Sequence, residues 1–270
     1  MNTTAIIAAI IALLGGFVAG NAIQDESTDI TQVTNQARER FMSENPPAQD
    51  FVSMRPGIEE LPVQTLSQEE LDGLLLMREE EKLARDVYQT LYEQWGLNIF
   101  SNIAQSEQTH TEAVRELLEK YDITDPVTND TIGVFQNETM QQLYNDLVAQ
   151  GSESEVAALK VGATIEDLDI KDLMDLTAET DNEDIKLVYE NLTRGSRNHL
   201  RSFTRQLTMR GESYEAQYIS AEDYQAILAS DQETGNGDHD HGGNMQNGGG
   251  QGQGTGSGNR GWGGGQGRNR

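Results

Sequence analysis

The stretch that decides the fold of this 270-residue chain runs from Ser67 to Trp95 and reads SQEELDGLLLMREEEKLARDVYQTLYEQW. It opens with SQEE, a capping-box pattern, which predicts that a helix begins there. Apolar residues then recur every three or four positions, as in a helix that buries one face. Glu80 flanks this apolar stripe and Glu79 falls on the face expected to be solvated. One glutamate interrupts the stripe, which consists of Leu74, Met77, Glu81, Ala84, Tyr88, Leu91 and Trp95.

Three further segments show the same period. They run from about Ile99 to Tyr121, from about Glu153 to Thr177, and from just after Asn182 to near Gly211. Each carries polar residues near the middle of its apolar stripe, where a core residue is expected. These polar residues are Glu107 and His110 in the first segment, Glu166 in the second, and Ser196 and His199 in the third.

We therefore expect an all-α protein built around a four-helix bundle. No segment alternates between apolar and polar residues for long, as a half-buried strand would. The connection over 122–152 is long and contains a short helical pattern at 138–150, which predicts a long crossover between the second and third bundle helices. A last short helix is expected at 221–229.

The folded domain is expected to span residues 66–230, between two polar ends. Residues 23–65 hold four of the five prolines and show no sustained period, so we interpret them as a linker or arm. Residues 231–270 form a glycine-rich tail, with 16 glycines among the last 36 residues. Such a composition buries too little apolar surface to offset the entropy of ordering, which predicts a disordered tail.

Residues 1–22 contain the one long apolar run, AIIAAIIALLGGFVAGNA at 5–22, and two interpretations of it stay open. Small residues at Ala19 and Ala22 suit cleavage of a signal peptide, although Lys and Arg are missing before the run. As an uncleaved membrane anchor, the run is at the lower length limit for spanning a bilayer. Either interpretation predicts an exported, extracellular or cell-surface protein.

Composition excludes several classes of function. The chain has 45 acidic and 19 basic side chains, a net charge of −26. Nucleic-acid binding is not expected, because contact with phosphates needs clustered Lys and Arg. The absence of cysteine excludes disulfides, zinc–thiolate sites and iron–sulfur clusters. Carboxylates and the four histidines are therefore the side chains left to hold a metal ion.

The interrupted stripes together predict a metal site. A single Glu in such a stripe ordinarily reaches water at the end of a bundle, and a single His is ordinarily a hydrogen-bonded core residue. Here all four helices are interrupted near the middle, by three Glu, two His and one Ser. Buried carboxylates without a counter-charge cost several kcal/mol each, roughly, and a bound cation offsets that cost.

The pattern resembles the ferritin-like superfamily, in particular rubrerythrin-type di-iron carboxylate bundles. EKLARDVY at 81–88 resembles the first helix of such proteins, and EQTH at 107–110 matches their Glu-x-x-His motif. The likeness is closest to a prokaryotic branch described as a domain of unknown function. It implies that Glu81, Glu107, His110, Glu166 and His199 bind metal, with Tyr88 as a hydrogen-bond donor to one carboxylate.

This chain departs from the resemblance at Ser196, where a second Glu-x-x-His motif would have glutamate. One carboxylate is therefore missing, and the number of ions bound stays open. Either water occupies the vacant position, or Ser196 opens a site for oxygen or peroxide. Without cysteine the chain also lacks the rubredoxin-like module that supplies electrons in rubrerythrins.

The resemblance implies iron as the cofactor, with two ions expected and manganese or zinc as alternatives. The first hypothesis is an oxidase or peroxide scavenger that reacts with dioxygen or peroxide. The second is a non-catalytic, metal-stabilised scaffold at the cell surface, and iron storage ranks third. The sequence leaves homo-oligomer formation, and anchoring to a membrane by the N-terminal segment, open.

Overall fold

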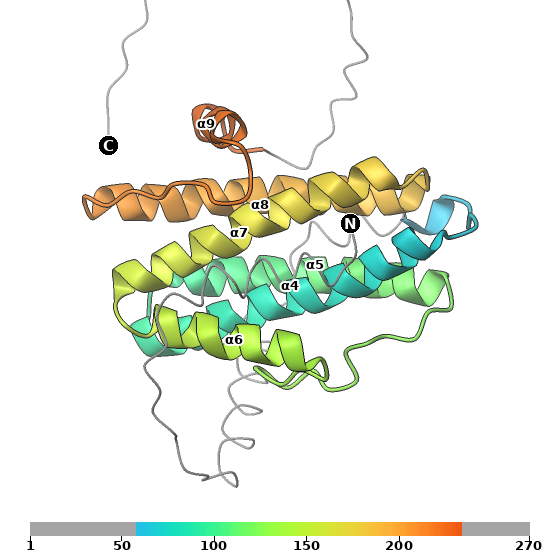
Figure 1. Ribbon diagram of the computed structural model, residues 1–270, viewed down its shortest axis with the longest axis horizontal. Coiled ribbons are helices and arrows are strands. Elements are labelled where there is room, and N and C mark those ends of the chain that lie inside the picture. The colour runs from blue at the N-terminus through green and yellow to red at the C-terminus, as the bar shows by residue number, and fades with distance from the viewer. Residues whose placement is uncertain (1–57, 234–270) are drawn as a thin grey trace, which may run out of the picture. The chain divides into compact units, whose positions relative to one another are not determined.

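The computed structural model describes residues 58–233, and all regular structure in this range is helical (Figure 1). The prediction of an all-α bundle is therefore confirmed. Residues 1–57 and 234–270 lie outside the described range, so the predictions for the apolar run, most of the linker and most of the tail concern residues that are not described. The helices are α4 (Gln68–Trp95), α5 (Asn98–Lys120), α6 (Glu138–Gly151), α7 (Glu155–Glu179), α8 (Glu183–Met209) and α9 (Ala221–Ala229).

Helix α4 begins at the capping box that the sequence predicts. The Ser67 hydroxyl accepts a hydrogen bond from the Glu70 backbone N–H at 3.1 Å, and the Glu70 carboxylate accepts from the Ser67 N–H at 2.8 Å. Gly96 ends the helix with φ of 65°, a left-handed conformation that glycine adopts without strain. The chain then turns directly into α5, so that α4 and α5 form an antiparallel pair.

Helices α7 and α8 form the second antiparallel pair, and the two pairs meet through contacts of α4 with α7 and of α5 with α8. The predicted crossover between the second and third bundle helices is confirmed, and its short helix α6 packs against α4 and α7 (Figure 1). The bundle helices begin and end within two residues of the predicted positions. The third starts after Ser154 because the Ser154 hydroxyl accepts from the Ala157 N–H at 3.0 Å.

The crossover also covers the charged side of α4, a side that would ordinarily be solvated. Arg85 donates to Asp86 on its own helix at 2.9 Å and to Asp130 of the crossover at 2.6 Å. Asp86 accepts from the Gly133 backbone N–H at 2.9 Å and pairs with Lys82. Lys82, Arg85 and Asp86 are each at most 3% exposed, so α4 is buried on both its apolar and its ionic side.

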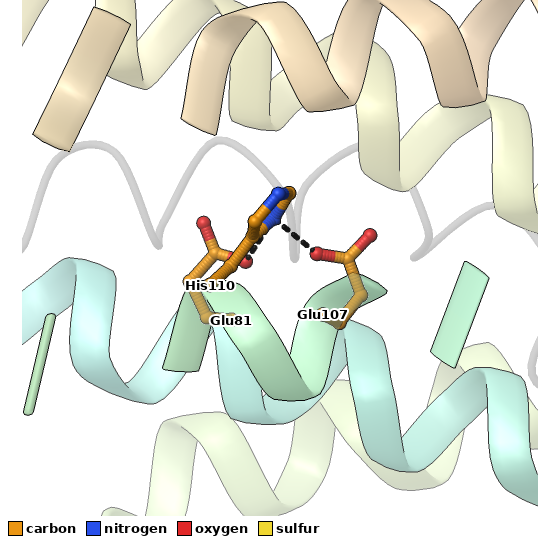
Figure 2. A group of neighbouring side chains, drawn as sticks. All are labelled: Glu81, Glu107 and His110. Carbon is orange, nitrogen blue, oxygen red and sulfur yellow. Dashed lines mark hydrogen bonds and ion pairs between the residues drawn. The ribbon is translucent and has the colours of Figure 1, made fainter. Parts of the chain in front are cut away.

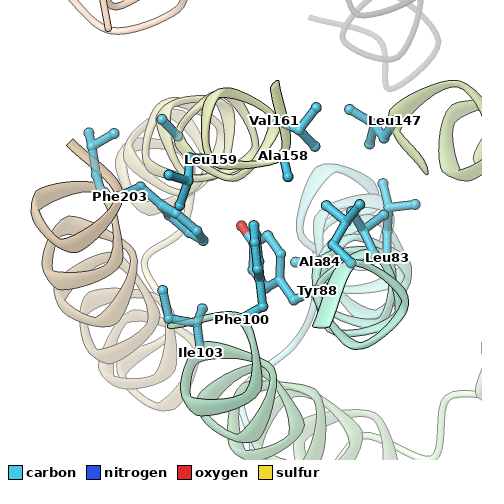
Figure 3. Packing of buried hydrophobic residues seen from close by; sticks show 14 of the residues in the cluster. Leu83, Ala84, Tyr88, Phe100, Ile103, Leu147, Ala158, Leu159, Val161 and Phe203 are labelled. Carbon is cyan, nitrogen blue, oxygen red and sulfur yellow. The ribbon is translucent and has the colours of Figure 1, made fainter. Parts of the chain in front are cut away.

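The apolar core consists of two clusters, one towards each end of the bundle. Figure 3 shows part of the larger cluster, in which the rings of Tyr88, Phe100 and Phe203 pack with centroids 5.4 to 6.2 Å apart. The other cluster joins Leu74 and Met77 of α4 to residues of α5, α7 and α8. Polar side chains occupy the layer between the clusters. None of the described helices is long and apolar enough to cross a membrane.

Candidate metal centre

The five predicted metal ligands meet in this polar layer. Each of them is at most 8% exposed. Their donor atoms fall into two groups, in each of which all atoms lie within 4.8 Å of one another. The first group is Glu81, Glu107 and His110, drawn in Figure 2, and the second is Glu107, Glu166 and His199.

Glu107 belongs to both groups and directs one oxygen to each. Its Oε2 lies 2.7 Å from Nδ1 of His110, and its Oε1 lies 2.8 Å from Nδ1 of His199. A second carboxylate faces each imidazole: Glu81 is 3.2 Å from His110 Nδ1, and Glu166 is 3.3 Å from His199 Nδ1. The centre thus consists of two similar halves that share Glu107.

The two contacts of His110 Nδ1 are hydrogen bonds, and all four separations also suit neighbouring ligands on one ion. With metal–ligand bonds of about 2.1 Å, adjacent donors of an octahedral ion are about 3.0 Å apart. The four nitrogen–oxygen distances range from 2.7 to 3.3 Å. A cation on each side of Glu107 therefore fits the spacing of the donors.

Several buried atoms of the centre have no hydrogen-bond partner. They include Oε1 of Glu81, Oε1 of Glu107 and Nδ1 of His199. The last two are only 2.8 Å apart, yet their geometry is not that of a hydrogen bond. Polar atoms left buried and unpaired are costly, so this arrangement favours a ligand that receives several lone pairs at once.

A glycine makes room for one of the imidazoles. A Cβ atom at Gly195 of α8 would lie 2.6 Å from both Cε1 and Nε2 of His110. The outer edge of the His110 ring therefore rests against the backbone of α8, which turns Nδ1 towards the carboxylates. The rings of His110 and His199 are stacked, with centroids 5.7 Å apart. The sequence analysis did not single out Gly195, because a close approach between helices leaves no mark in a hydrophobic period.

Tyr88 of α4 lies beside the second half of the centre. Its hydroxyl donates to the Glu166 carboxylate and lies 3.3 Å from the Gly162 carbonyl oxygen. Burial, and then the negative charge of Glu166, raise the pKa of Tyr88 well above its ordinary value. Tyr88 therefore stays protonated and fixes one oxygen of Glu166, which is the role that the resemblance implies for it.

Asp169 is a carboxylate of this layer that the sequence analysis missed. The Ser196 hydroxyl donates to Asp169 and to the Leu192 carbonyl oxygen, the latter at 2.9 Å. A carboxylate from α7, one turn after Glu166, thus lies at Ser196, although neither group of three donors includes it. The spacing Glu166-x-x-Asp169 was the available signal, because residues three apart share a helix face.

The charges of the layer do not balance without a cation or bound protons. Four carboxylates face two imidazoles, so two negative charges remain even when both imidazoles are protonated. Burial lowers the pKa of His199, but the charges of Glu107 and Glu166 outweigh it and raise that pKa to about 10. Burial and the charge of Glu166 raise the pKa of Asp169 to about 8. Without metal the centre therefore keeps protons that a bound cation would displace.

A small cavity of about 40 Å³ adjoins the centre between α4, α6 and α7. Glu81, Glu107, Glu166 and Asp169 line one part of it, and apolar residues such as Leu83 and Leu147 line another. A water molecule needs roughly 10–15 Å³ by this measure, so the cavity admits a molecule as small as dioxygen or peroxide.

Similar proteins share the helical domain. A family model described as "Uncharacterized protein domain (DUF2202)" matches residues 70–231. Over 178 residues the chain is 62% identical to "Uncharacterized protein MJ0754" of Methanocaldococcus jannaschii, a match that covers 66% of this chain and 96% of that protein. The crystal structure of hypothetical protein MJ0754 from the same organism is similar with a TM-score of 0.64, over 64% of this chain and 99% of that one.

Proposed function

The chain belongs to the DUF2202 family, in line with its expected likeness to a domain of unknown function, and we propose that it is a ferritin-like protein that binds two transition-metal ions. The observation that carries the proposal is the position of Glu107, whose two oxygens face two different histidines at 2.7 and 2.8 Å. A carboxylate shared in this way is suited to bridging a pair of ions.

The residues divide between the two ions by their contacts. Glu81 and His110 would hold the first ion, Glu166 and His199 would hold the second, and Glu107 would serve both. Imidazole and carboxylate suit iron, manganese and zinc alike. Iron is our choice of metal, because the resemblance to di-iron bundles implies it. When bound, a pair of Fe²⁺ ions would supply electrons that reduce dioxygen or peroxide.

The protein's own residues prepare the centre for that chemistry. The Tyr88 hydroxyl orients Glu166, and the backbone at Gly195 orients His110. Apolar residues on either side of the layer exclude bulk water, which strengthens every charge interaction within it. The adjoining cavity offers room for a small oxidant next to three of the proposed ligands. This room is the feature that suits a redox function more than a scaffold.

Metal content tests the binding proposal. The full chain, purified without chelator and loaded with Fe²⁺ without oxygen, should retain two ions. Glu107→Gln removes charge from both halves and should lose both ions, whereas Glu119→Gln, on the same helix with a side chain 64% exposed, should retain two. Equal metal content in the two variants would overturn the proposal of a shared centre.

Exposure to air tests the redox proposal separately. Oxygen consumption, measured with an electrode as Fe²⁺ is added, should accompany a rising near-ultraviolet absorbance in the full chain. Both signals should be absent with Zn²⁺ and in the Glu107→Gln variant. Binding of two ions without oxygen or peroxide consumption would instead support the metal-stabilised scaffold.

The proposed location is outside the cytoplasm, as the apolar run at 5–22 suggests. This run lies outside the described residues, so the proposal rests on sequence alone. Fractionation of cells that produce the full chain, with an antibody against the helical domain, would test it.

A further inference from the structure

A second group of buried carboxylates lies next to the centre without belonging to it. Glu80 of α4 is 8% exposed, and neither of its oxygens has a hydrogen-bond partner. Asp172 of α7 is 2% exposed, and its Oδ2 has no partner either. The two groups of three donors found around Glu107 include neither residue.

The packing of α4 against α7 brings Glu80 and Asp172 to the same level. The helices are antiparallel, since Gly73 lies against Leu176 while the Tyr88 hydroxyl lies 3.3 Å from the Gly162 carbonyl oxygen. Glu80 lies seven residues after Gly73, roughly 10 Å along α4. Asp172 lies four residues before Leu176, roughly 6 Å in the same direction because α7 is antiparallel. Side chains lean towards the N-terminus of their own helix, so those of Glu80 and Asp172 lean towards each other.

The electrostatics of Glu80 agree with this placement. Among the charged residues around Glu80, the negative charge of Asp172 acts on it most strongly. Asp169 and Glu81 of the centre contribute after it. The Tyr189 hydroxyl of α8, which faces α4 at Gly73, is also buried without a partner, and the charge of Glu80 acts on it.

Outside the Glu107 centre, the buried aspartates Asp86 and Asp184 have cationic partners that offset the cost of burial. Asp86 pairs with Lys82 and Arg85. Asp184 pairs with Lys120 at 2.6 Å. Against that background, two neighbouring carboxylates with three unpaired oxygens lack only a cation.

We propose that Glu80 and Asp172 bind a divalent cation in a site of their own, beside the Glu107 centre. Oxygen ligands without imidazole suit Mn²⁺, Mg²⁺ or Fe²⁺. Glu80 also lines the cavity that Glu81 and Asp169 line, so an ion held there adjoins the cavity next to the centre. The site does not depend on whether the Glu107 centre binds metal.

Binding of Mn²⁺ to the full chain, followed by the electron paramagnetic resonance of the free ion, tests the site. Wild-type protein should bind one more Mn²⁺ than the Glu80→Gln and Asp172→Asn variants. Where a variant still binds that ion, its affinity should be lower by about tenfold or more. Glu79→Gln is the matched control, because Glu79 is the adjacent glutamate and already accepts from Asn137 at 3.2 Å. It should bind as the wild type does.

The Glu107→Gln background separates this site from the proposed function. In that background Mn²⁺ should still bind, and the addition of Glu80→Gln should abolish the remaining binding. Thermal unfolding provides a second readout: Mn²⁺ should raise the Tm of the Glu107→Gln variant but not that of the double variant. The site is refuted when Glu80→Gln and Glu79→Gln, both folded, bind Mn²⁺ alike, since the two carboxyls then simply share a proton.

Discussion

Replacing Gly195 with alanine should weaken metal binding although it improves the helix in which it lies. The added Cβ would lie 2.6 Å from His110 Cε1 and Nε2, which is 0.8 Å short of the 3.4 Å at which ordinary contact begins. Metal–ligand distances tolerate only about 0.2 Å of error. The imidazole therefore has to turn away from its ion, or α5 has to move away from α8.

The two effects of Gly195→Ala have opposite signs. Alanine in a helix interior is favoured over glycine by about 1 kcal/mol, which stabilises the metal-free protein. Disturbing a residue that orients a metal-bound histidine costs about 10- to 100-fold in affinity, or roughly 1.4 to 2.7 kcal/mol. We therefore expect the free energy of unfolding of the metal-free variant to rise, by an amount reduced by the strain at His110. We also expect the first ion to bind more weakly.

Isothermal titration with Fe²⁺ or Mn²⁺ under nitrogen measures the affinity, and urea unfolding of the metal-free variant measures the stability. Gly151→Ala is the matched control, because its Cβ would meet Leu91 at 2.7 Å, in the apolar core and away from the centre. It should change stability and leave affinity unchanged. Equal affinity of Gly195→Ala and the wild type would refute the view that Gly195 positions His110.

Three further predictions concern the same layer. Asp169→Asn should weaken binding of a metal ion by about tenfold in calorimetry, because it removes a carboxylate that lines the cavity. Unchanged binding would mean that Asp169 only accepts the hydrogen bond from Ser196 and does not affect the metal. Tyr88→Phe should lower the free energy of unfolding by about 1–3 kcal/mol in urea, since Glu166 loses its hydroxyl donor while buried; an unchanged value would show that this hydrogen bond has no net effect. In metal-free protein, Asp169 with a pKa of about 8 and His199 with a pKa of about 10 both bind more protons when folded than when unfolded. The free energy of unfolding should therefore fall between about pH 4 and pH 10, and bound metal should remove that fall; parallel curves for metal-free and metal-loaded protein would contradict a shared site.

The residues of the layer were predictable from sequence where each interrupts an apolar stripe. Glu81, Glu107, His110, Glu166 and His199 all lie at such positions, and the structure brings them together. A hydrophobic period reports which face of a helix is buried, and in a bundle the middles of the buried faces meet.

Asp169 and Glu80 escaped that reasoning for a geometric reason. The stripe of α7 passes from Glu166 to Ile170, so Asp169 lies at its margin, and Glu80 likewise flanks the stripe of α4. Whether a marginal residue faces the interior depends on the rotation of each helix about its axis. That rotation is set by the packing of all neighbours, which one sequence does not reveal.

The ionic side of α4 was equally hidden. Lys82, Arg85 and Asp86 have the composition of a solvated face, and the period indicates nothing that would cover them. Their partners, among them Asp130 and Gly133, lie in the crossover about 45 residues away. Pairing over such a separation depends on the path of a loop, which has no periodic signature.

The burial of α4 on both sides bears on how ions bound at the proposed centre would leave the domain. Backbone amides protected in this manner exchange with deuterium only when the whole domain opens, whereas amides near chain ends exchange through local fraying. The amides around Glu81 should therefore be among the slowest in the domain. Ions bound at the proposed centre would then leave by side-chain motion at the cavity next to α6, whose amides should exchange sooner, and not by fraying of α4. The lifetime of the metal and the lifetime of the fold would then be separate quantities, the first set by a few rotamers and the second by the whole bundle.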